Sequence, residues 1–74
     1  MEYKGYNDYM VEVYSGDDRL GTFQYVTNVW TLTFWLRIHF LYWKWTSLKV
    51  YHRMTNIFIG EYKRGGDIPA KPQL

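Results

Sequence analysis

The residue types that carry catalysis or bind metals are scarce in this sequence and lie far apart. His39 and His52 are its two histidines, 13 positions apart, and it has no cysteine. A zinc site needs clustered nitrogen, sulfur or carboxylate ligands, which these residues do not supply. Ser15 and Ser47 lack the surroundings of a nucleophile elbow, and Gly65-Gly66 lacks the lysine and helix of a phosphate loop. We therefore expect no catalytic residue, no metal site and no cofactor, and predict that the protein is not an enzyme.

Aromatic side chains are the residues with the greatest binding potential, and they are concentrated in one segment. Aromatics make up 22% of the chain, and residues 29–45 contain all four tryptophans. Tryptophan and tyrosine provide much of the affinity in protein interfaces, since they offer a large contact area at a low cost in conformational entropy. The alternative is that these rings form the hydrophobic core. The residues predicted to form an interface are Trp30, Trp35, Tyr42, Trp43 and Trp45.

Charged residues are divided unevenly along the chain. Residues 1–18 carry a net charge of −4 and residues 19–74 a net charge of +6, which together give the formal charge of +2. Such an asymmetry steers a chain onto partners of either sign, although scattered and solvated surface charge would give the same totals. The charged residues predicted to bind a partner are Glu12, Asp17, Asp18, Arg53, Lys63 and Arg64.

The aromatic segment must be placed on either a helix or a strand. Its even positions from Trp30 to Tyr42 are all apolar, which is a strand-like alternation. A strand over residues 29–45 would span roughly 57 Å, about twice the diameter expected for a domain of this size. A helix of the same length spans about 25 Å. We therefore predict a helix over 29–45, with Thr27 or Asn28 as its N-cap.

Alternating segments on both sides of this helix predict two β-hairpins. The expected strands are 9–15 and 19–26, joined by a turn at 16–18, and 48–54 and 57–63, joined by a turn at 55–56. Gly21 and Gly60 stand at matching positions of the return strands, where the absence of a side chain would make room for the helix across the sheet.

These elements predict an α+β fold, a small hairpin–helix–hairpin (ββαββ) with one aromatic-rich central helix on an antiparallel sheet. Residues 1–64 would form a single small domain. Residues 65–74 contain two glycines and two prolines, and are expected to form a flexible C-terminal tail. The alternative is an all-β five-stranded meander or barrel, in which 29–41 is a long bent strand.

A helix that is apolar nearly all round must be covered on all sides, and two hairpins cover one face only. We therefore expect a homodimer, in which a second copy covers the outward face. The segment is short for a membrane span and carries Arg37, His39 and Lys44, so no membrane association is expected. The acidic and polar N-terminus lacks the pattern of a signal peptide, and we predict a cytoplasmic protein.

Two binding functions are compatible with these features. Small, cysteine-free, aromatic-rich domains without an active site resemble, in type rather than in motif, phage-encoded inhibitors of host machinery. We expect the chain to act in the host cytoplasm on a larger replication, transcription or defence protein, such as a DNA sliding clamp or a polymerase. Its acidic residues would block the DNA-binding surface by replacing phosphates. The alternative is a small single-stranded nucleic-acid-binding protein, in which aromatic rings stack on bases and basic residues contact phosphates.

Overall fold

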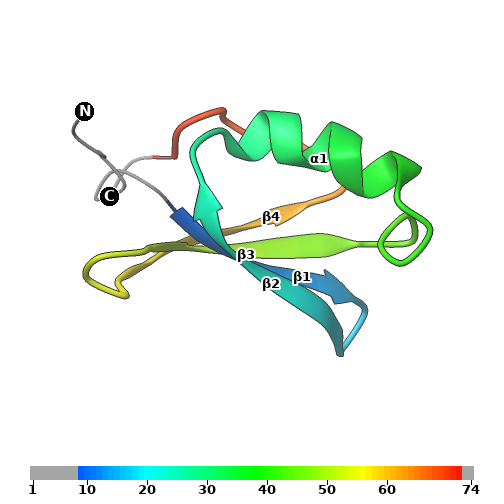
Figure 1. The fold of residues 1–74 in the computed structure, drawn as a ribbon, viewed down its shortest axis with the longest axis horizontal. Helices are drawn as coiled ribbons and strands as arrows, with labels where there is room; N and C mark the ends of the chain where they lie inside the picture. The colour runs from blue at the N-terminus through cyan, green and yellow to red at the C-terminus, as the bar shows by residue number, and fades with distance from the viewer. Residues whose placement is uncertain (1–8, 73–74) are drawn as a thin grey trace.

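A computed structural model of the chain describes residues 9–72 (Figure 1). The elements, in chain order, are β1 (Tyr9–Ser15), β2 (Asp18–Val26), α1 (Val29–Ile38), β3 (Ser47–His52) and β4 (Phe58–Lys63). The four strands form one antiparallel sheet in the order β2-β1-β3-β4, and α1 lies over one face of it. The predicted α+β class and the ββαββ order are confirmed, and the all-β alternative is not observed.

The core lies between α1 and the two central strands. Val11 pairs with Val50 and Val13 pairs with Leu48, and these four side chains are completely buried. Because side chains alternate along a strand, these residues share the face of the sheet that α1 covers, while Glu12 and its alternate neighbours lie on the open face. The apolar alternation in the sequence thus sets which face of the sheet carries the helix.

Helix α1 begins at an asparagine cap and buries one stripe. The side-chain oxygen of Asn28 accepts a hydrogen bond of 2.9 Å from the backbone N–H of Thr31. Asn28 is therefore the N-cap, and it is one of the two residues predicted for that position. The buried residues are Val29, Thr33 and Leu36, which follow helical spacing. Thr33 is accommodated in the core because its hydroxyl donates to the carbonyl of Trp30 at 2.6 Å.

The predicted helix over 29–45 is too long, since α1 ends at Ile38. His39 has extended backbone (φ −89°, ψ 127°), and residues 40–44 form turns. This change of direction brings Trp45 back onto the sheet, where it is only 2% exposed. Burial of one of the largest side chains therefore opposes continuation of the helix.

Gly21 makes room for an aromatic ring, although the ring comes from the turns after α1 rather than from α1. A Cβ atom at Gly21 would lie 3.0 Å from the Cε1 and the hydroxyl of Tyr42. Gly60 was expected to have the same role, but the nearest side chain to it is Tyr62, whose hydroxyl would lie 3.3 Å from a Cβ atom there. Only the first of the two glycines therefore admits a ring from the segment between the hairpins.

Residues 65–72 were expected to form a tail outside the domain, and they do lack helix and strand. However, they pack against the domain, and Ile68 contacts the core while Pro72 is buried. The carbonyl of Ala70 accepts a hydrogen bond of 2.8 Å from the N–H of Val29, and the carbonyl of Pro72 accepts one of 2.6 Å from the Tyr9 hydroxyl. This segment therefore completes the packing around the start of α1. Residues 73 and 74 lie outside the described part.

Candidate protein-binding surface

The outward side of α1 and the turns that follow it carry a continuous run of large apolar side chains, here called the aromatic surface. Two of its members, Ile38 and Phe40, are 83% and 78% exposed. The aromatic surface consists of Trp30, Phe34, Trp35, Ile38, Phe40, Leu41 and Trp43. Scattered apolar residues are common on protein surfaces, whereas a cluster of this kind makes the surface a candidate site of interaction.

Ring-to-ring contacts hold several members of this surface in place. Trp30 and Phe34 pack edge to face with ring centroids 4.6 Å apart. Trp35 packs against Phe23 of β2 at 5.5 Å and against Tyr42 at 5.8 Å. Such contacts reduce the conformational freedom of the rings before any partner arrives, so that less entropy is lost on binding.

The five residues predicted to form the interface fall into two groups. Trp30, Trp35 and Trp43 are exposed and belong to the aromatic surface. Trp45 is a core residue, and Tyr42 is half-buried against Gly21, so neither presents a free ring to a partner. This division arises because α1 ends at Ile38. No residue of the helix-breaking types marks that end in the sequence.

Sequence analysis did not select four other members of the aromatic surface. These are Phe34, Ile38, Phe40 and Leu41. Phe34 and Ile38 follow Trp30 at intervals of four residues, which places all three on one face of a helix. That spacing, applied to the shorter helix, would have identified Phe34 and Ile38.

Two basic residues border the aromatic surface, and Asp67 is an acidic residue that lines the same hollow as Trp30 and Phe34. The sequence contains no aspartate or glutamate between Asp18 and Glu61. Arg37 in the last turn of α1 and Lys44 in the following turns are both exposed. The segment that carries the aromatic surface therefore contributes only basic charges to its border.

The acidic residues predicted to bind a partner do not lie beside this surface. Asp17 and Asp18 are exposed at the turn between β1 and β2, on the side of the sheet away from α1 (Figure 1). Glu12 lies on the open face of the sheet, where its carboxylate accepts hydrogen bonds from the hydroxyls of Tyr14 at 3.1 Å and Tyr51 at 3.3 Å. Burial, followed by the negative charge of Glu12, raises the pKa of Tyr51.

The three basic residues predicted to bind a partner also have different roles. Arg53 lies over the ring of Tyr25 at 4.7 Å, and Lys63 is exposed at the end of β4. The Arg64 side chain donates through one nitrogen to the carbonyls of Trp43 and Trp45 at 2.5 and 3.1 Å. Arg64 therefore fixes the turns after α1 in place. Lys63 and Arg64 line a hollow together with Asp17 of the acidic turn, whereas Arg53 lies elsewhere, beside Tyr25. The predicted partner-binding residues therefore do not all form one patch.

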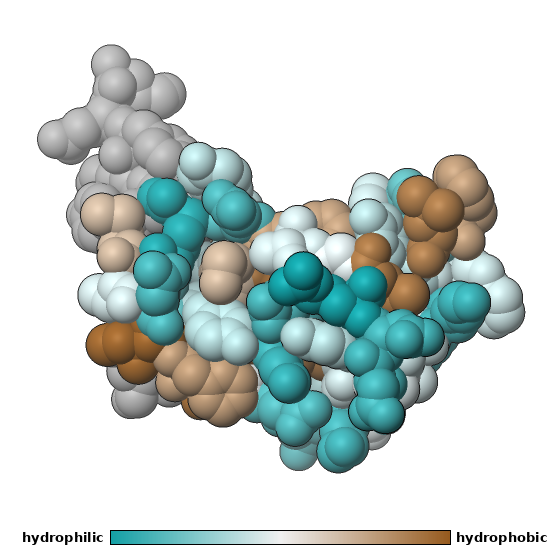
Figure 2. Space-filling model, turned by 90° about the horizontal axis from the view of Figure 1, so that it is seen from below, coloured by the Kyte–Doolittle hydropathy of each residue, from teal (hydrophilic) through white to brown (hydrophobic). Residues whose placement is uncertain are grey.

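The open face of the sheet is largely hydrophilic, with apolar residues toward its margins (Figure 2). Glu12 occupies its centre, paired with Lys49 across β1 and β3 and bridged to Arg19 at 3.4 Å. The ammonium group of Lys49 lies 4.8 Å from the centre of the Tyr14 ring. The tyrosine rings on this face therefore already contact charged groups of the same chain.

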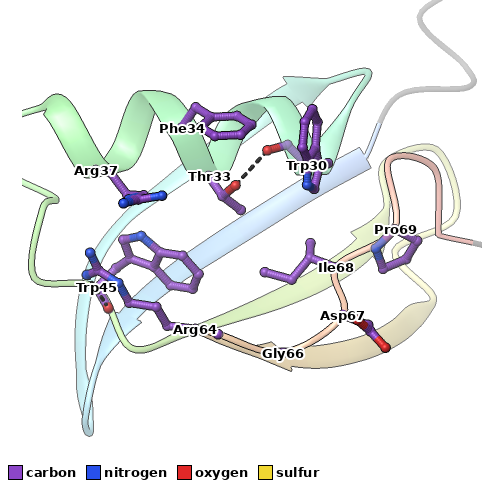
Figure 3. A pocket seen from close by; sticks show the side chains of 11 residues that line it. Trp30, Thr33, Phe34, Arg37, Trp45, Arg64, Gly66, Asp67, Ile68 and Pro69 are labelled. Atoms are coloured by element: carbon purple, nitrogen blue, oxygen red, sulfur yellow. Dashed lines mark hydrogen bonds between the residues drawn. The ribbon is translucent and has the colours of Figure 1, made fainter.

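A groove of about 560 Å³ lies between α1 and residues 64–69 (Figure 3). One end is formed by the charged and indole side chains of Arg37, Arg64 and Trp45. The groove continues along Trp30 and Phe34, which also belong to the aromatic surface. This groove was not anticipated from the sequence, because residues 65–74 were assigned to a tail.

The described residues offer little for metal chemistry. Within 9–72, no group of three or more histidine, cysteine, aspartate or glutamate side chains is placed to hold a metal ion. His39 packs among the rings of Trp35 and Tyr42, with ring centroids 4.5 and 4.9 Å away. No helix in this part of the chain is both long enough and apolar enough to cross a bilayer.

Comparison of the chain with protein-family models, with curated proteins and with solved structures finds no match.

Proposed function

We propose that this chain is a non-enzymatic protein-binding domain, and that it inhibits a larger protein by occupying part of its surface. The single observation that carries this proposal is the aromatic surface on α1 and the turns after it. Its tryptophans and phenylalanines are the residue types that dominate binding energy at interfaces, and they are partly held in place by their own contacts.

The charges beside this surface indicate the chemistry of the partner. Arg37 and Lys44 border it, and no acidic residue is found between Asp18 and Glu61. Two copies meeting through this face would bring the basic side chains of both into one interface, with no carboxylate from the same segment to pair with them. A different protein that presents an apolar surface bordered by carboxylates is complementary in both respects.

Single-stranded nucleic acid is the second candidate partner, because basic and aromatic residues alternate on the open face of the sheet. Tyr14 and Tyr25 each lie beside a cation, Lys49 and Arg53 respectively. The carboxylate of Glu12 lies in the middle of that face, where it repels phosphates. These contacts favour a protein over a nucleic acid as the partner.

The acidic turn gives a more specific form of the proposal, in which the inhibitor covers a DNA-binding surface. Asp17 and Asp18 are exposed at the β1–β2 turn, and this turn lies on the side of the sheet away from α1. A flat partner surface cannot contact both the turn and the aromatic surface. Mimicry of DNA by this turn would therefore require a partner that wraps around the edge of the sheet.

Affinity capture with paired variants tests the proposal. The wild-type chain is immobilised and exposed to a bacterial lysate, and retained proteins are identified by mass spectrometry, purified and titrated against the chain. The double variant Ile38→Gln/Phe40→Gln removes the two most exposed apolar side chains of the aromatic surface. Loss of two such contacts should weaken the affinity for the purified partner by about 30-fold or more.

The matched control is Met54→Gln/Ile57→Gln, which removes two exposed apolar side chains from the β3–β4 turn. Its affinity should stay within about twofold of the wild type. Hydrogen exchange of the complex should show protection over residues 29–43. Equal affinity of the wild type and the α1 variant, or protection confined to the open face of the sheet, would contradict the proposal. Sedimentation of the chain alone establishes whether a second copy takes the place of the partner.

A further inference from the structure

The indole N–H of Trp45 is a buried hydrogen-bond donor for which residues 9–72 provide no acceptor. Buried donors are normally paired, because a polar group removed from water without a partner is costly. Trp45 lines the groove between α1 and residues 64–69. In Figure 3 the nitrogen-bearing edge of its indole is turned toward α1, from which Arg37 projects. An oxygen acceptor that reaches this end of the groove would therefore pair with a donor that residues 9–72 leave unpaired.

Two arginines stand beside this unpaired donor. The Arg64 guanidinium lies 5.4 Å from the centre of the Trp45 indole and is fixed there by its bonds to the carbonyls of Trp43 and Trp45. The Arg37 guanidinium lines the same groove and forms no hydrogen bond or ion pair with any other described side chain. This end of the groove thus combines two cations and one neutral donor, which together match a single anionic oxygen group.

The rest of the groove is mainly apolar. Trp30, Phe34, Ile68 and Pro69 line it, and Asp67 contributes one negative charge. A dianion such as phosphate would be repelled by Asp67 and would leave the apolar walls without contacts. A single carboxylate attached to an apolar or aromatic group would pair with the cations and also fill the apolar part.

We propose that this groove is a binding site for a monocarboxylate that carries an apolar or aromatic body. The carboxylate accepts from the indole N–H of Trp45 and pairs with Arg37, and the body lies against Trp30 and Phe34. The indole nitrogen is covered in the free chain. The exposed Arg37 side chain is the group that turns to admit the ligand. The carboxylate comes either from a free small acid or from the C-terminal end of a peptide.

The position of Arg37 also has a purely structural explanation. It lies in the last turn of α1, where a cation interacts favourably with the free carbonyl groups. That effect accounts for a basic residue at this position. It does not account for an indole N–H without an acceptor, and it would give no response of Trp45 to an added acid.

A titration observed at the indole group tests the site directly. The indole ¹H–¹⁵N signal of Trp45 is assigned with the variant Trp45→Phe and followed while phenylacetate is added. The signal should shift downfield and saturate in the millimolar range, which is typical of a fragment-sized ligand. Phenylacetamide, which has the same shape without the charge, should cause no comparable shift. Inorganic phosphate and acetate should each bind more weakly than phenylacetate.

Paired variants then separate a binding role from a structural one. Arg37→Gln should weaken phenylacetate binding by about tenfold, since a charged hydrogen-bond partner is lost. Lys44→Gln removes a nearby exposed cation that does not line the groove, and its affinity should equal that of the wild type. A tripeptide ending in phenylalanine, compared with its C-terminal amide, distinguishes a peptide source from a free acid.

Three results would overturn the inference. They are an indole signal of Trp45 that stays unmoved by phenylacetate, tighter binding of phosphate than of phenylacetate, and equal affinity of the wild type and Arg37→Gln. Because this experiment needs no partner protein, its failure would leave the proposed function of the aromatic surface unaffected.

Discussion

Leu36 and Ile38 lie two residues apart on α1, but truncation should cost far more stability at Leu36 than at Ile38. Leu36 is completely buried against the sheet, whereas Ile38 is 83% exposed. Replacing each by alanine removes side chains of equal size from the same helix. The comparison therefore tests the orientation of α1, on which the aromatic surface depends.

The expected magnitudes follow from burial. Leu36→Ala removes three buried carbons, worth about 2.4 kcal/mol by transfer. The cavity that remains raises the total loss to about 3–4 kcal/mol. A domain of this length has a free energy of unfolding of about 4–11 kcal/mol, so this variant loses between about a quarter and all of its stability. Because Ile38 is 83% exposed, Ile38→Ala loses only about one sixth of that transfer energy, roughly 0.4 kcal/mol. The higher helix propensity of alanine offsets part of this loss.

Urea denaturation followed by circular dichroism measures both values. We expect the midpoint of Leu36→Ala to fall far below that of the wild type and the midpoint of Ile38→Ala to stay close to it. Equal losses in the two variants would refute the orientation of α1. A loss in Ile38→Ala that disappears on dilution would instead show that a second copy covers this face in solution.

Three other perturbations test contacts described above. Gly21→Ala should destabilise the domain by about 1–3 kcal/mol in urea denaturation, because its Cβ would lie 3.0 Å from Tyr42. A double-mutant cycle with Tyr42→Leu should show coupling between the two sites. Arg64→Gln should lower thermal stability by about 1–2 kcal/mol, because two hydrogen bonds to backbone carbonyls are lost. Lys63→Gln, at the exposed neighbouring residue, should change thermal stability by no more than about 0.5 kcal/mol. Burial and a nearby carboxylate raise the pKa of Tyr51 above the ordinary tyrosine value of 10.0, so the folded state favours the neutral phenol. That contribution to stability is complete below pH 10.0 and is lost as the pH rises through the folded-state pKa, so the free energy of unfolding should fall more steeply above pH 10.0 in the wild type than in Tyr51→Phe.

The sequence was sufficient to predict the elements and their order, because the signals for them are local. Alternating apolar residues mark β1 and β3, and Asn28 marks the start of α1 through its side-chain oxygen. The pairing of β1 with β3 in the centre of the sheet is not local. It depends on which hairpin edges meet, and no turn or spacing in the sequence encodes it.

The end of α1 could not be predicted for a different reason. Between Ile38 and Trp45 the chain contains no glycine or proline, so local preference permits a longer helix. The helix ends because burial of Trp45 against the sheet and the bonds from Arg64 stabilise the turns. For the candidate site, the kind of surface was predictable from the tryptophans, but the division between core and surface residues was not.

The contact between Tyr9 and Pro72 has a consequence for biosynthesis. These residues are 63 positions apart and join the first strand to the last segment of the domain. A ribosome-bound chain cannot close this end of its core until residue 72 has been made. Until then the nascent polypeptide displays apolar rings that are destined for the interior as well as those that stay outside. We therefore expect its production to depend on chaperones that bind such rings.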